Sequence, residues 1–536
     1  MANRERQIRI YDLHSWTGVA LGLLLFVVCF TGSLALFHDE LKVWEDPAKR
    51  TPVAEDIYPI HDRMTQWIEQ HRDGREIVFA GVFLPEGDSG FVDTSVTFRD
   101  EDGEFDNHHQ HWDTSSAAAL PIREDGANRF LYDLHRDLAW PEVLGGRQVG
   151  RFIVGLVGIA FLLSIVTGIV AHTKIKKELF SLRYLKSVRL KWQDSHKVLG
   201  LWTTPFAGMI AITGAFLGVI ALLLPLLAFL TVKGDQEKLI NELGLGAGEP
   251  AGISAPMQSV DGYFARTHPD TGKAVTSIFI NHYGDQNAVY TLNYKADDRL
   301  VFFDQELFSG VDGSRIENKD VFQSDNALPR ILAAFSPLHY GTYGGIVLKL
   351  IYFALGLGLA IMTALGSMMW IERRRHGGEG TKTDRFYGVL SFITTGVCAG
   401  LPVASIAVLH FDKFYAGSET NRYASMVWAF FAIWITTLAF AAIRGNDYKA
   451  TREMLGFTGV ALIALAPVNW VVTGGTMWST LGTPAEGSGW FDIAFILVGV
   501  ATIASALRLP SERPSDTRRS QSQQLPDPDM GLQPAE

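Results

Sequence analysis

Six of the 15 histidines lie at the ends of long apolar segments, where their imidazole nitrogens could bind a metal at the edge of a lipid bilayer. Three are expected at the inner membrane level and three at the outer level: His14, His172 and His196 form the inner set, and His38, His135 and His339 form the outer set. Imidazole is a normal axial ligand of haem iron. Because an electron path across a membrane needs more than one redox centre, the pattern predicts two b-type haems, one at each level.

One metal centre cannot use both sets of histidines. His14 and His38 are 24 residues apart on one apolar segment. In a helix this spacing corresponds to roughly 36 Å, which exceeds the roughly 30 Å of the hydrocarbon core. The two sets therefore belong to separate sites.

An internal repeat places these histidines in equivalent positions. Four residues occur twice with identical intervals between them: His14, Gly18, Thr31 and Gly32, and then His196, Gly200, Thr213 and Gly214. The closing parts of the repeats also correspond, as Leu134-His135 before Gly145-Gly146 and as Leu338-His339 before Gly344-Gly345. Both copies start on the same side of the membrane, so we expect them to be related by an axis along the membrane normal, with a shared site at that axis.

The repeat favours pairing His14 with His196 and His135 with His339, but it leaves alternatives open. Histidines at helix ends also occur in the interfacial region without any cofactor, although ionisable residues within a membrane are functional candidates. His38 aligns with Ile220, and His172 aligns with about Trp370. Three candidates therefore compete at each level, and the repeat does not decide the pairs.

The elements that must position these histidines are membrane helices. Eight apolar runs are each about long enough to cross a bilayer, and they lie near Thr17–Phe37, Phe152–Ala171, Val198–Leu230, Gly345–Ile371, Tyr387–Leu409, Ala424–Ala442, Leu455–Val472 and Phe491–Leu507. Lys and Arg gather in the loops at 172–197 and 373–385. Cytoplasmic loops carry such an excess, so both termini should be cytoplasmic and two long inserts periplasmic, as in a multi-pass protein of a bacterial inner membrane.

Seven parts of the chain follow from these boundaries. They are a cytoplasmic N-terminus with helix 1 (1–38), a first periplasmic insert (39–151), helices 2 and 3 with a basic cytoplasmic loop (152–231), a second periplasmic insert (232–343), helix 4 (344–376), an additional block of four helices (377–509) and a disordered cytoplasmic tail (510–536). The fold class is a mostly α-helical membrane protein with about eight transmembrane helices and two α+β inserts.

Each insert has the pattern of a small α+β unit. Helical spacing of apolar residues from Ile57 to Ile68 precedes two strand-like runs, Glu76–Leu84 and Phe91–Phe98, with a Gly-rich turn between them. The second insert has a possible helix after a Ser254 cap and a hairpin formed by Ala274–His282 and Ala288–Tyr294. The cluster of His108, His109 and His111 is interpreted as part of a polar loop, since short His-rich tracts are only a weak sign of metal binding.

Several function classes are excluded by what the sequence lacks. The two cysteines, Cys29 and Cys398, lie in apolar runs, so there is no covalent haem attachment motif and no cysteine metal site. No Walker sequence, HExxH motif or nicotinamide module occurs. The net charge of −10 gives no sign of a nucleic acid partner. Because the sequence has no nicotinamide module, electrons must come from a separate donor, a quinol or a reductase.

These residues resemble the PepSY-associated transmembrane proteins, which include iron-regulated membrane proteins and ferric-siderophore reductases. The resemblance covers about residues 4–376 and is carried by Leu13-His14-Ser15-Trp16-Thr17-Gly18, Thr31-Gly32, Trp44 to Pro47, Asp194-Ser195-His196 and Leu338-His339-Tyr340-Gly341 before Gly344-Gly345. It implies four core helices, PepSY-like periplasmic inserts and, in reductase members, two b-type haems held by histidines near the two membrane faces. The block from about Tyr387 to Leu507 has no place in this pattern.

The interpretation favoured by the sequence is a haem-dependent membrane oxidoreductase that passes electrons to a periplasmic ferric chelate such as a ferric siderophore. One alternative is a non-enzymatic membrane module whose inserts bind a peptide, a protease or a transport partner. Another is a siderophore or metal permease without a redox step. Haem content distinguishes the first interpretation from the other two.

Reporter fusions test the predicted topology. Because positive loops stay in the cytoplasm, a reporter at Asp88 or Asp285 should report the periplasm and one at Ser187 should report the cytoplasm. A cytoplasmic signal from either insert would contradict the assignment of the histidines to the two levels.

Overall fold

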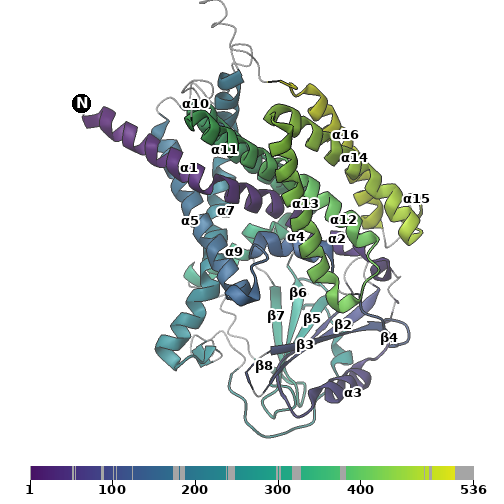
Figure 1. Ribbon diagram of the computed structural model, residues 1–536. Helices are drawn as coiled ribbons and strands as arrows, with labels where there is room; N and C mark the ends of the chain where they lie inside the picture. The colour runs from purple at the N-terminus through teal and green to yellow at the C-terminus, as the bar shows by residue number, and fades with distance from the viewer. Residues whose placement is uncertain are drawn as a thin grey trace, which may run out of the picture.

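The chain folds into a helical layer above a single β-sheet (Figure 1). The computed structural model describes residues 2–50, 54, 56–85, 90–100, 102–103, 105–123, 125–172, 175, 180, 188–236, 238–239, 248–296, 300, 303–316, 327–374, 382–475, 477–481 and 486–512. The turn after residue 85, most of the basic loop at 173–187 and the tail from residue 513 lie outside the described residues.

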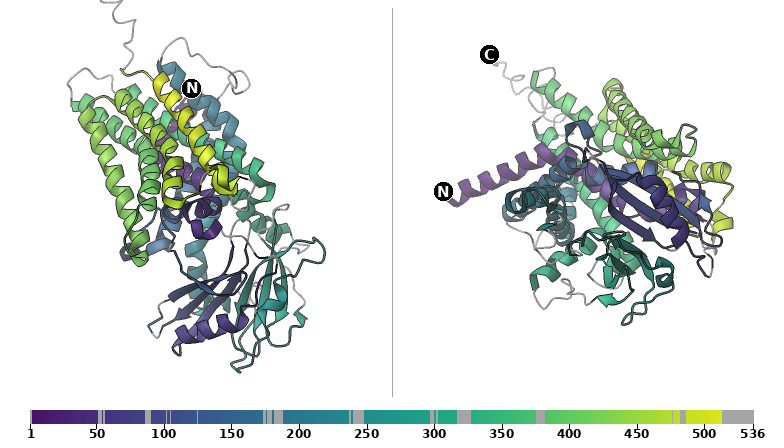
Figure 2. Two further views of the ribbon diagram at one scale, coloured as in Figure 1. Left: turned by 90° about the vertical axis from the view of Figure 1, so that its right-hand side faces the viewer. Right: turned by 90° about the horizontal axis from the view of Figure 1, so that it is seen from below.

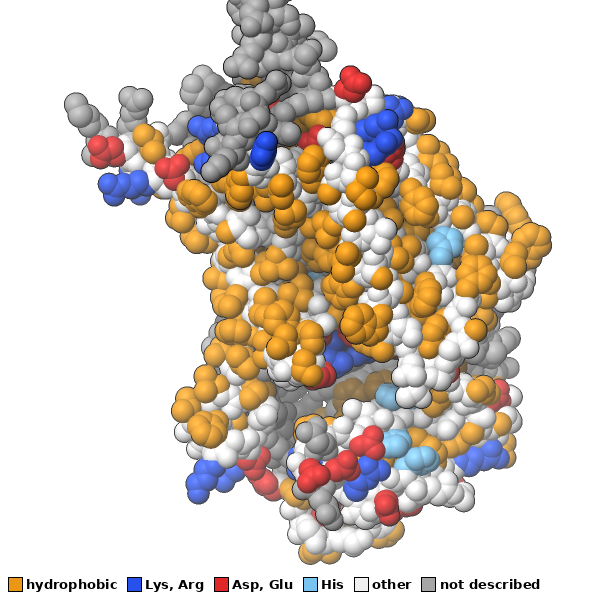
Figure 3. Space-filling model, in the orientation of Figure 1, with side chains coloured by type: hydrophobic (Ala, Val, Ile, Leu, Met, Phe, Trp, Pro, Cys, Tyr) orange, Lys and Arg blue, Asp and Glu red, His pale blue; other side chains and the backbone are white. Residues whose placement is uncertain are grey.

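The described residues contain eight helical spans long and apolar enough to cross a membrane, which confirms the predicted fold class. One of the eight, Arg385–Lys413, comprises two of the helices named next. The helices are α1 (Ala2–Ala35), α2 (His38–Glu45), α3 (His61–Arg72), α4 (Ala127–Arg136), α5 (Gly146–Ala171), α7 (Val188–Val232), α9 (Ala327–Tyr340), α10 (Gly345–Arg374), α11 (Lys382–Cys398), α12 (Gly400–Lys413), α13 (Arg422–Arg444), α14 (Asp447–Thr473), α15 (Met477–Thr480) and α16 (Glu486–Arg508). Apolar side chains cover the helical layer, while charged side chains are frequent on the sheet layer (Figure 3). This distribution is the one expected of a chain whose helices face lipid.

Helices α1, α5, α7 and α10 form the core bundle, and small residues let them approach closely. A Cβ atom on Gly158 of α5 would stand 3.2 Å from the Cβ of Ala215 on α7. The repeat-related Gly356 of α10 packs in the same way on Ser33 of α1. Small residues at helix crossings are the usual basis of tight packing in membranes. The bundle therefore has the two-fold character that the repeat predicts.

The remaining spans form a second block beside the core. The fifth apolar run is divided into α11 and α12 with a break at Ala399, and both belong to one candidate span, Arg385–Lys413. The described chain ends, at residues 2 and 512, lie on the side of the helical layer away from the sheet (Figure 2). The α+β layer and the two ends are therefore on opposite sides of the spans.

The two inserts share one antiparallel sheet. Its strands are β1 (Glu76–Phe83), β2 (Phe91–Arg99), β3 (Phe105–Asp113), β4 (Ala119–Leu120), β5 (Val275–Asn281), β6 (Val289–Lys295), β7 (Phe303–Ser309) and β8 (Arg315–Ile316). Their order is β4-β3-β2-β1-β5-β6-β7-β8, so β1 of the first insert pairs with β5 of the second, Gly81 facing Phe279 and Val82 facing Ile278. The repeat axis thus passes between β1 and β5, and each insert covers the edge strand of the other.

Two local predictions were wrong. The segment with His108, His109 and His111 is strand β3 and not a loop, because alternate side chains pack on the sheet: the His111 ring stacks on Phe91 with centroids 4.1 Å apart. The helix expected after Ser254 is instead a short 3-10 turn, Val260–Tyr263, whose N-cap is Ser259. Ser254 forms an isolated β-bridge with Asp285.

Candidate functional site

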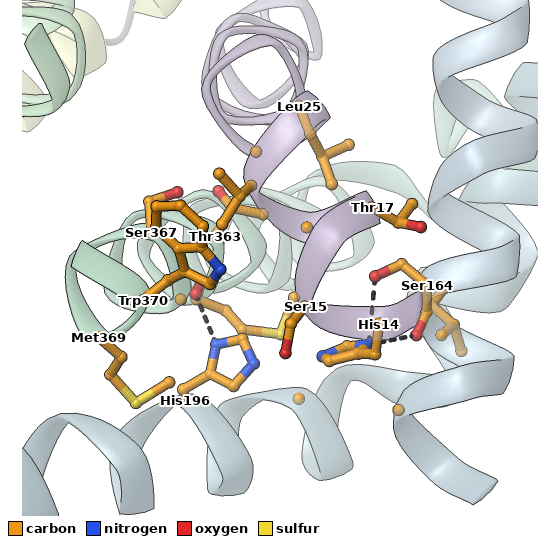
Figure 4. A pocket seen from close by; sticks show the side chains of 18 of the residues that line it. His14, Ser15, Thr17, Leu25, Ser164, His196, Thr363, Ser367, Met369 and Trp370 are labelled. Atoms are coloured by element: carbon orange, nitrogen blue, oxygen red, sulfur yellow. Dashed lines mark hydrogen bonds between the residues drawn. The ribbon is translucent and has the colours of Figure 1, made fainter. Parts of the chain in front are cut away.

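The inner candidate site lies between α1 and α7. The imidazole rings of His14 and His196 face a common cavity, with ring centroids 6.3 Å apart and planes inclined by 61° (Figure 4). The cavity has a volume of about 820 Å³ and is also lined by α5 and α10. Gly18 lines it as well, and no atom lies within 4 Å of the position that a Gly18 Cβ would take. The missing side chain leaves room for a planar ligand beside the two rings.

The outer candidate site lies between the short helices α4 and α9. The rings of His135 and His339 have centroids 6.1 Å apart and are nearly parallel, with planes inclined by 18°. In sequence, His339 follows His135 by 204 residues. Only the packing of α4 against α1 and of α9 against α7 brings these rings to one place.

All four rings are oriented by a hydrogen bond at Nδ1. At the inner level, Nδ1 of His14 lies 3.0 Å from the carbonyl oxygen of Ser164, and Nδ1 of His196 lies 2.8 Å from that of Met362. At the outer level, Nδ1 of His135 lies 2.9 Å from the carbonyl oxygen of Val28, and Nδ1 of His339 lies 3.0 Å from Oγ1 of Thr213. A carbonyl oxygen only accepts, and the Thr213 hydroxyl already donates to the carbonyl of Met209 at 2.8 Å. Each Nδ1 therefore carries the hydrogen, and each Nε2 has its lone pair available for a metal.

Glycines on the helices that supply the hydrogen-bond acceptors lie close against the rings. A Cβ on Gly32 would stand 2.7 Å from the His135 ring, and one on Gly214 would stand 2.8 Å from the His339 ring. The inner rings have the same arrangement, with 3.1 Å from Gly168 to His14 and 3.0 Å from Gly366 to His196. These distances leave no room for a side chain without moving a ring. Gly32 and Gly214 of the repeat are therefore explained as ring contacts, and Thr213 as the acceptor for His339.

The ring spacing fits a metal between the imidazoles of each pair. Metal–imidazole bonds of about 2.0–2.1 Å would place the two bound nitrogens roughly 4 Å apart and the two ring centres roughly 6 Å apart. Within the described part of the chain, the buried Ser367 Oγ and Trp370 Nε1 beside the inner rings have no hydrogen-bond partner. The donor set, the glycine contacts and these unpaired polar atoms fit a haem with two axial histidines.

The other two candidates take different positions. The His38 ring lies against Tyr132, with centroids 4.7 Å apart, and is not stacked on another histidine. His172 is the residue that ends α5; it lines the inner cavity, but the pair at its centre is His14 and His196. Of the three candidates at each level, the structure thus brings together the two that the repeat relates.

Each histidine is held by its own repeat and faces a histidine of the other. His14 and His135 bond to α5 and α1 of the first repeat, while His196 and His339 bond to α10 and α7 of the second. A site at each end of the bundle therefore requires both repeats. This is the geometry expected of parallel repeats related by an axis along the membrane normal.

Sequence reasoning missed part of the site. Gly168 and Gly366, which contact the inner rings, were not singled out, although they occupy similar positions in α5 and α10, 22 residues after Gly146 and 21 residues after Gly345. Arg373 and Arg374 were used only to orient the chain, but both line the inner cavity. The repeat could have identified these glycines if it had also been compared between the two helices that face the histidines.

Comparison with known proteins gives a family match and a curated relative. A family model described as "PepSY-associated TM region" matches residues 11–373. A curated relative, the uncharacterized protein PA4219 of Pseudomonas aeruginosa, is 26% identical over 372 residues, which cover 67% of this chain and 90% of that protein. The family match spans both repeats and ends before α11.

Substituting the ring-contacting glycines tests the site. Gly168→Leu should displace the His14 ring, and Gly32→Leu should displace the His135 ring. If each histidine pair binds a haem, either variant should lose the low-spin signal of its own level, about half of the total. Electron paramagnetic resonance of the purified protein measures both. Gly456→Leu is the matched control, since no atom lies within 4 Å of its Cβ position. Equal losses at both levels from either variant would contradict the assignment.

Proposed function

The chain belongs to the family with a PepSY-associated TM region, and we propose that it is a di-haem membrane oxidoreductase that passes electrons across the bilayer to a ferric chelate such as a ferric siderophore. The observation that carries the proposal is the pair of imidazoles at each end of the bundle, with ring centroids 6.3 and 6.1 Å apart. Two such sites in one chain are suited to electron transfer and have no evident use in a module that only binds a peptide.

The residues around the inner pair suit the carboxylates of a haem. His14 and His196 would be the axial ligands, and the guanidinium groups of Arg373 and Arg374 supply positive charge at the cavity edge. Arg373 donates to the hydroxyl of Tyr11 at 2.6 Å, and the Arg374 guanidinium lies 4.1 Å from the Trp370 ring centre. These contacts position both cations. A bound haem would supply reversible one-electron chemistry at its iron.

The spacing of the two levels supports a path across the membrane. On α1, His14 and the outer-ring contact Gly32 are 18 residues apart, or roughly 27 Å of helix. This length approaches the roughly 30 Å of a hydrocarbon core. Phe161 and Leu359, which the repeat relates, pack together between the levels. The chain thus holds its two candidate centres near opposite faces with apolar packing between them.

A second cavity supports a small chelate as the acceptor. It has a volume of about 580 Å³ and lies between strand β3 and the end of α4, where Asp133 and Asp137 flank His135 in sequence. Arg129 and Arg147 also line it. One electron delivered here would reduce Fe(III) in the chelate to Fe(II), which hard oxygen ligands hold less firmly. The electron must come from a separate quinol or reductase.

The cofactor content tests the proposal directly. Protein purified from haem-replete cells should show a low-spin b-type spectrum with about two haems per chain, and acid should extract the haem because no covalent attachment motif is present. A haem-free preparation that is stably folded would reject the oxidoreductase and favour a binding module or a permease.

Histidine substitutions connect the cofactor to the reaction. His135→Ala or His339→Ala should remove the outer centre, and His14→Ala or His196→Ala the inner one, each with a loss of about half of the haem. The dithionite-reduced protein should be reoxidised by a ferric hydroxamate, with Fe(II) captured in a trap, and loss of the outer centre should block this transfer. His410→Ala is the control, since its Nε2 bonds the carbonyl of Ala461 in the additional block. Haem without chelate-dependent reoxidation would leave an electron carrier and remove the chelate as acceptor.

A further inference from the structure

We propose that the C-terminal block, α11 to α16, is an intramolecular clamp that fixes helix α4 and thereby positions the outer histidine, His135. The block lies outside the family match, which ends at residue 373. The contacts of the clamp stand without any cofactor, and the effect on an outer haem rests on the proposed function. Three groups of contacts carry the inference, at the start, the middle and the end of α4.

The start of α4 is capped by a carboxylate from α2. Oε1 of Glu45 accepts a hydrogen bond from the backbone NH of Ala127 at 2.8 Å, and Oε2 accepts one from Asn128 at 3.4 Å. A carboxylate at this end satisfies unpaired NH groups and interacts favourably with the helix dipole. Glu45 is 4% exposed, so its orientation depends on what packs behind it.

The block supplies that packing. Asp412 at the end of α12 and Arg422 at the start of α13 are both buried, and Nη2 of Arg422 donates to Oδ1 of Asp412 at 2.6 Å. A Cβ on Gly126, the residue before α4, would collide with Asp412 Oδ1 and stand 2.6 Å from Glu45 Oε1. The Asp412–Arg422 pair therefore lies directly against the capped helix end.

Lys413 joins the C-terminal end of α2 to the block. Nζ of Lys413 donates to the carbonyl oxygens of Trp44 and Glu45 at 2.8 and 3.2 Å and lies 3.9 Å from the centre of the Trp44 ring. The Trp44 indole NH donates to Oδ1 of Asp492 on α16 at 2.9 Å. Buried charges are costly to leave without partners. Separation of the block from Trp44 and Glu45 would leave several of these buried groups without partners.

The rest of α4 is also in contact with α13. The rings of Phe130 and Phe430 have centroids 4.8 Å apart, and both side chains are fully buried. Closer to the histidine, the Tyr423 hydroxyl donates to Oδ2 of Asp133 at 2.9 Å. Asp133 also accepts from Arg129 and Arg136, so it joins the block to both ends of the turn that carries His135.

The repeat-related helix α9 serves as the internal comparison. Ile331 of α9 corresponds to Ala127 of α4, since each precedes its histidine by eight residues. Ile331 is 54% exposed, whereas Ala127 is fully buried. The block thus covers one of two helices that the repeat made equivalent, and His135 and His339 differ in how firmly their helices are held.

The test uses full-length variants that disturb the junction in different ways. Gly126→Ala inserts a methyl group between Glu45 and Asp412 without removing a charge, Asp412→Asn removes the charge from the pair, and Tyr423→Phe removes only the hydroxyl bond to Asp133. The control is Glu453→Gln, which breaks an exposed ion pair with Arg444 in the same block. Arg422→Lys keeps the positive charge and should be milder than Arg422→Gln.

Amide hydrogen exchange is the primary measurement because it needs no haem. We expect exchange in residues 127–136 to become at least about tenfold faster in Gly126→Ala and Asp412→Asn, with a smaller change in Tyr423→Phe and none in residues 327–340 or in the control. In haem-loaded protein, the outer low-spin signal should broaden or fall while the inner signal persists.

The remaining outcomes separate the clamp from the di-haem proposal. Unchanged exchange in α4 of folded Gly126→Ala and Asp412→Asn rejects the clamp, whether or not haem is bound. Equal acceleration in α4, α9 and the core helices means general destabilisation and also rejects it. A protein without haem whose α4 alone responds retains the clamp and rejects the di-haem proposal.

Discussion

The hydrogen bond at Nδ1 of each of the four paired imidazoles is the constraint from which the rest of the arrangement follows. Since the acceptors at Nδ1 are three backbone carbonyls and one hydroxyl whose own hydrogen is engaged, every ring keeps the lone pair of Nε2 available for a metal. Two of the acceptors, the carbonyls of Ser164 and Met362, belong to helices that follow long inserts. The inner pair therefore needs α5 and α10 packed against the helices that carry the histidines, and a glycine beside each of the four rings allows that close approach.

The two-fold character of the chain extends from the membrane layer into the sheet. Each histidine pair takes one ring from each repeat, and the β1–β5 pairing joins the two inserts along the same axis. A sheet edge left uncovered would expose unpaired NH and carbonyl groups. Each insert covers the edge of the other, so the sheet holds together the outer ends of the two repeats. The helix-end positions of His135 and His339 thereby depend on packing in both layers.

The additional block breaks this symmetry at one place. It buries one face of α4 and the charged groups around Glu45, while Ile331 of α9 is exposed. In a low-dielectric environment, a buried acid–base cluster is stable only when all members keep their partners. Lys413 meets that condition through the carbonyls of Trp44 and Glu45. Asp412 lies between Arg422 of the block and Arg123 of the first insert, at 2.6 and 3.6 Å, so the block is energetically tied to the first repeat although it lies outside the family match.

The sequence by itself determined the membrane class, the eight spans, four of the strands and the levels of the histidines, because apolar length and local periodicity are properties of neighbouring residues. Tertiary structure decided which histidines pair, that the inserts share a sheet and that His108 to His111 form a strand. The histidine pairs and the shared sheet depend on contacts between segments more than 100 residues apart in the sequence, such as Gly32 with His135. The strand of His108 to His111 depends on its pairing with β2 and on the direction of its side chains. A linear pattern records where a ring lies along its helix, but only helix packing decides what that ring faces.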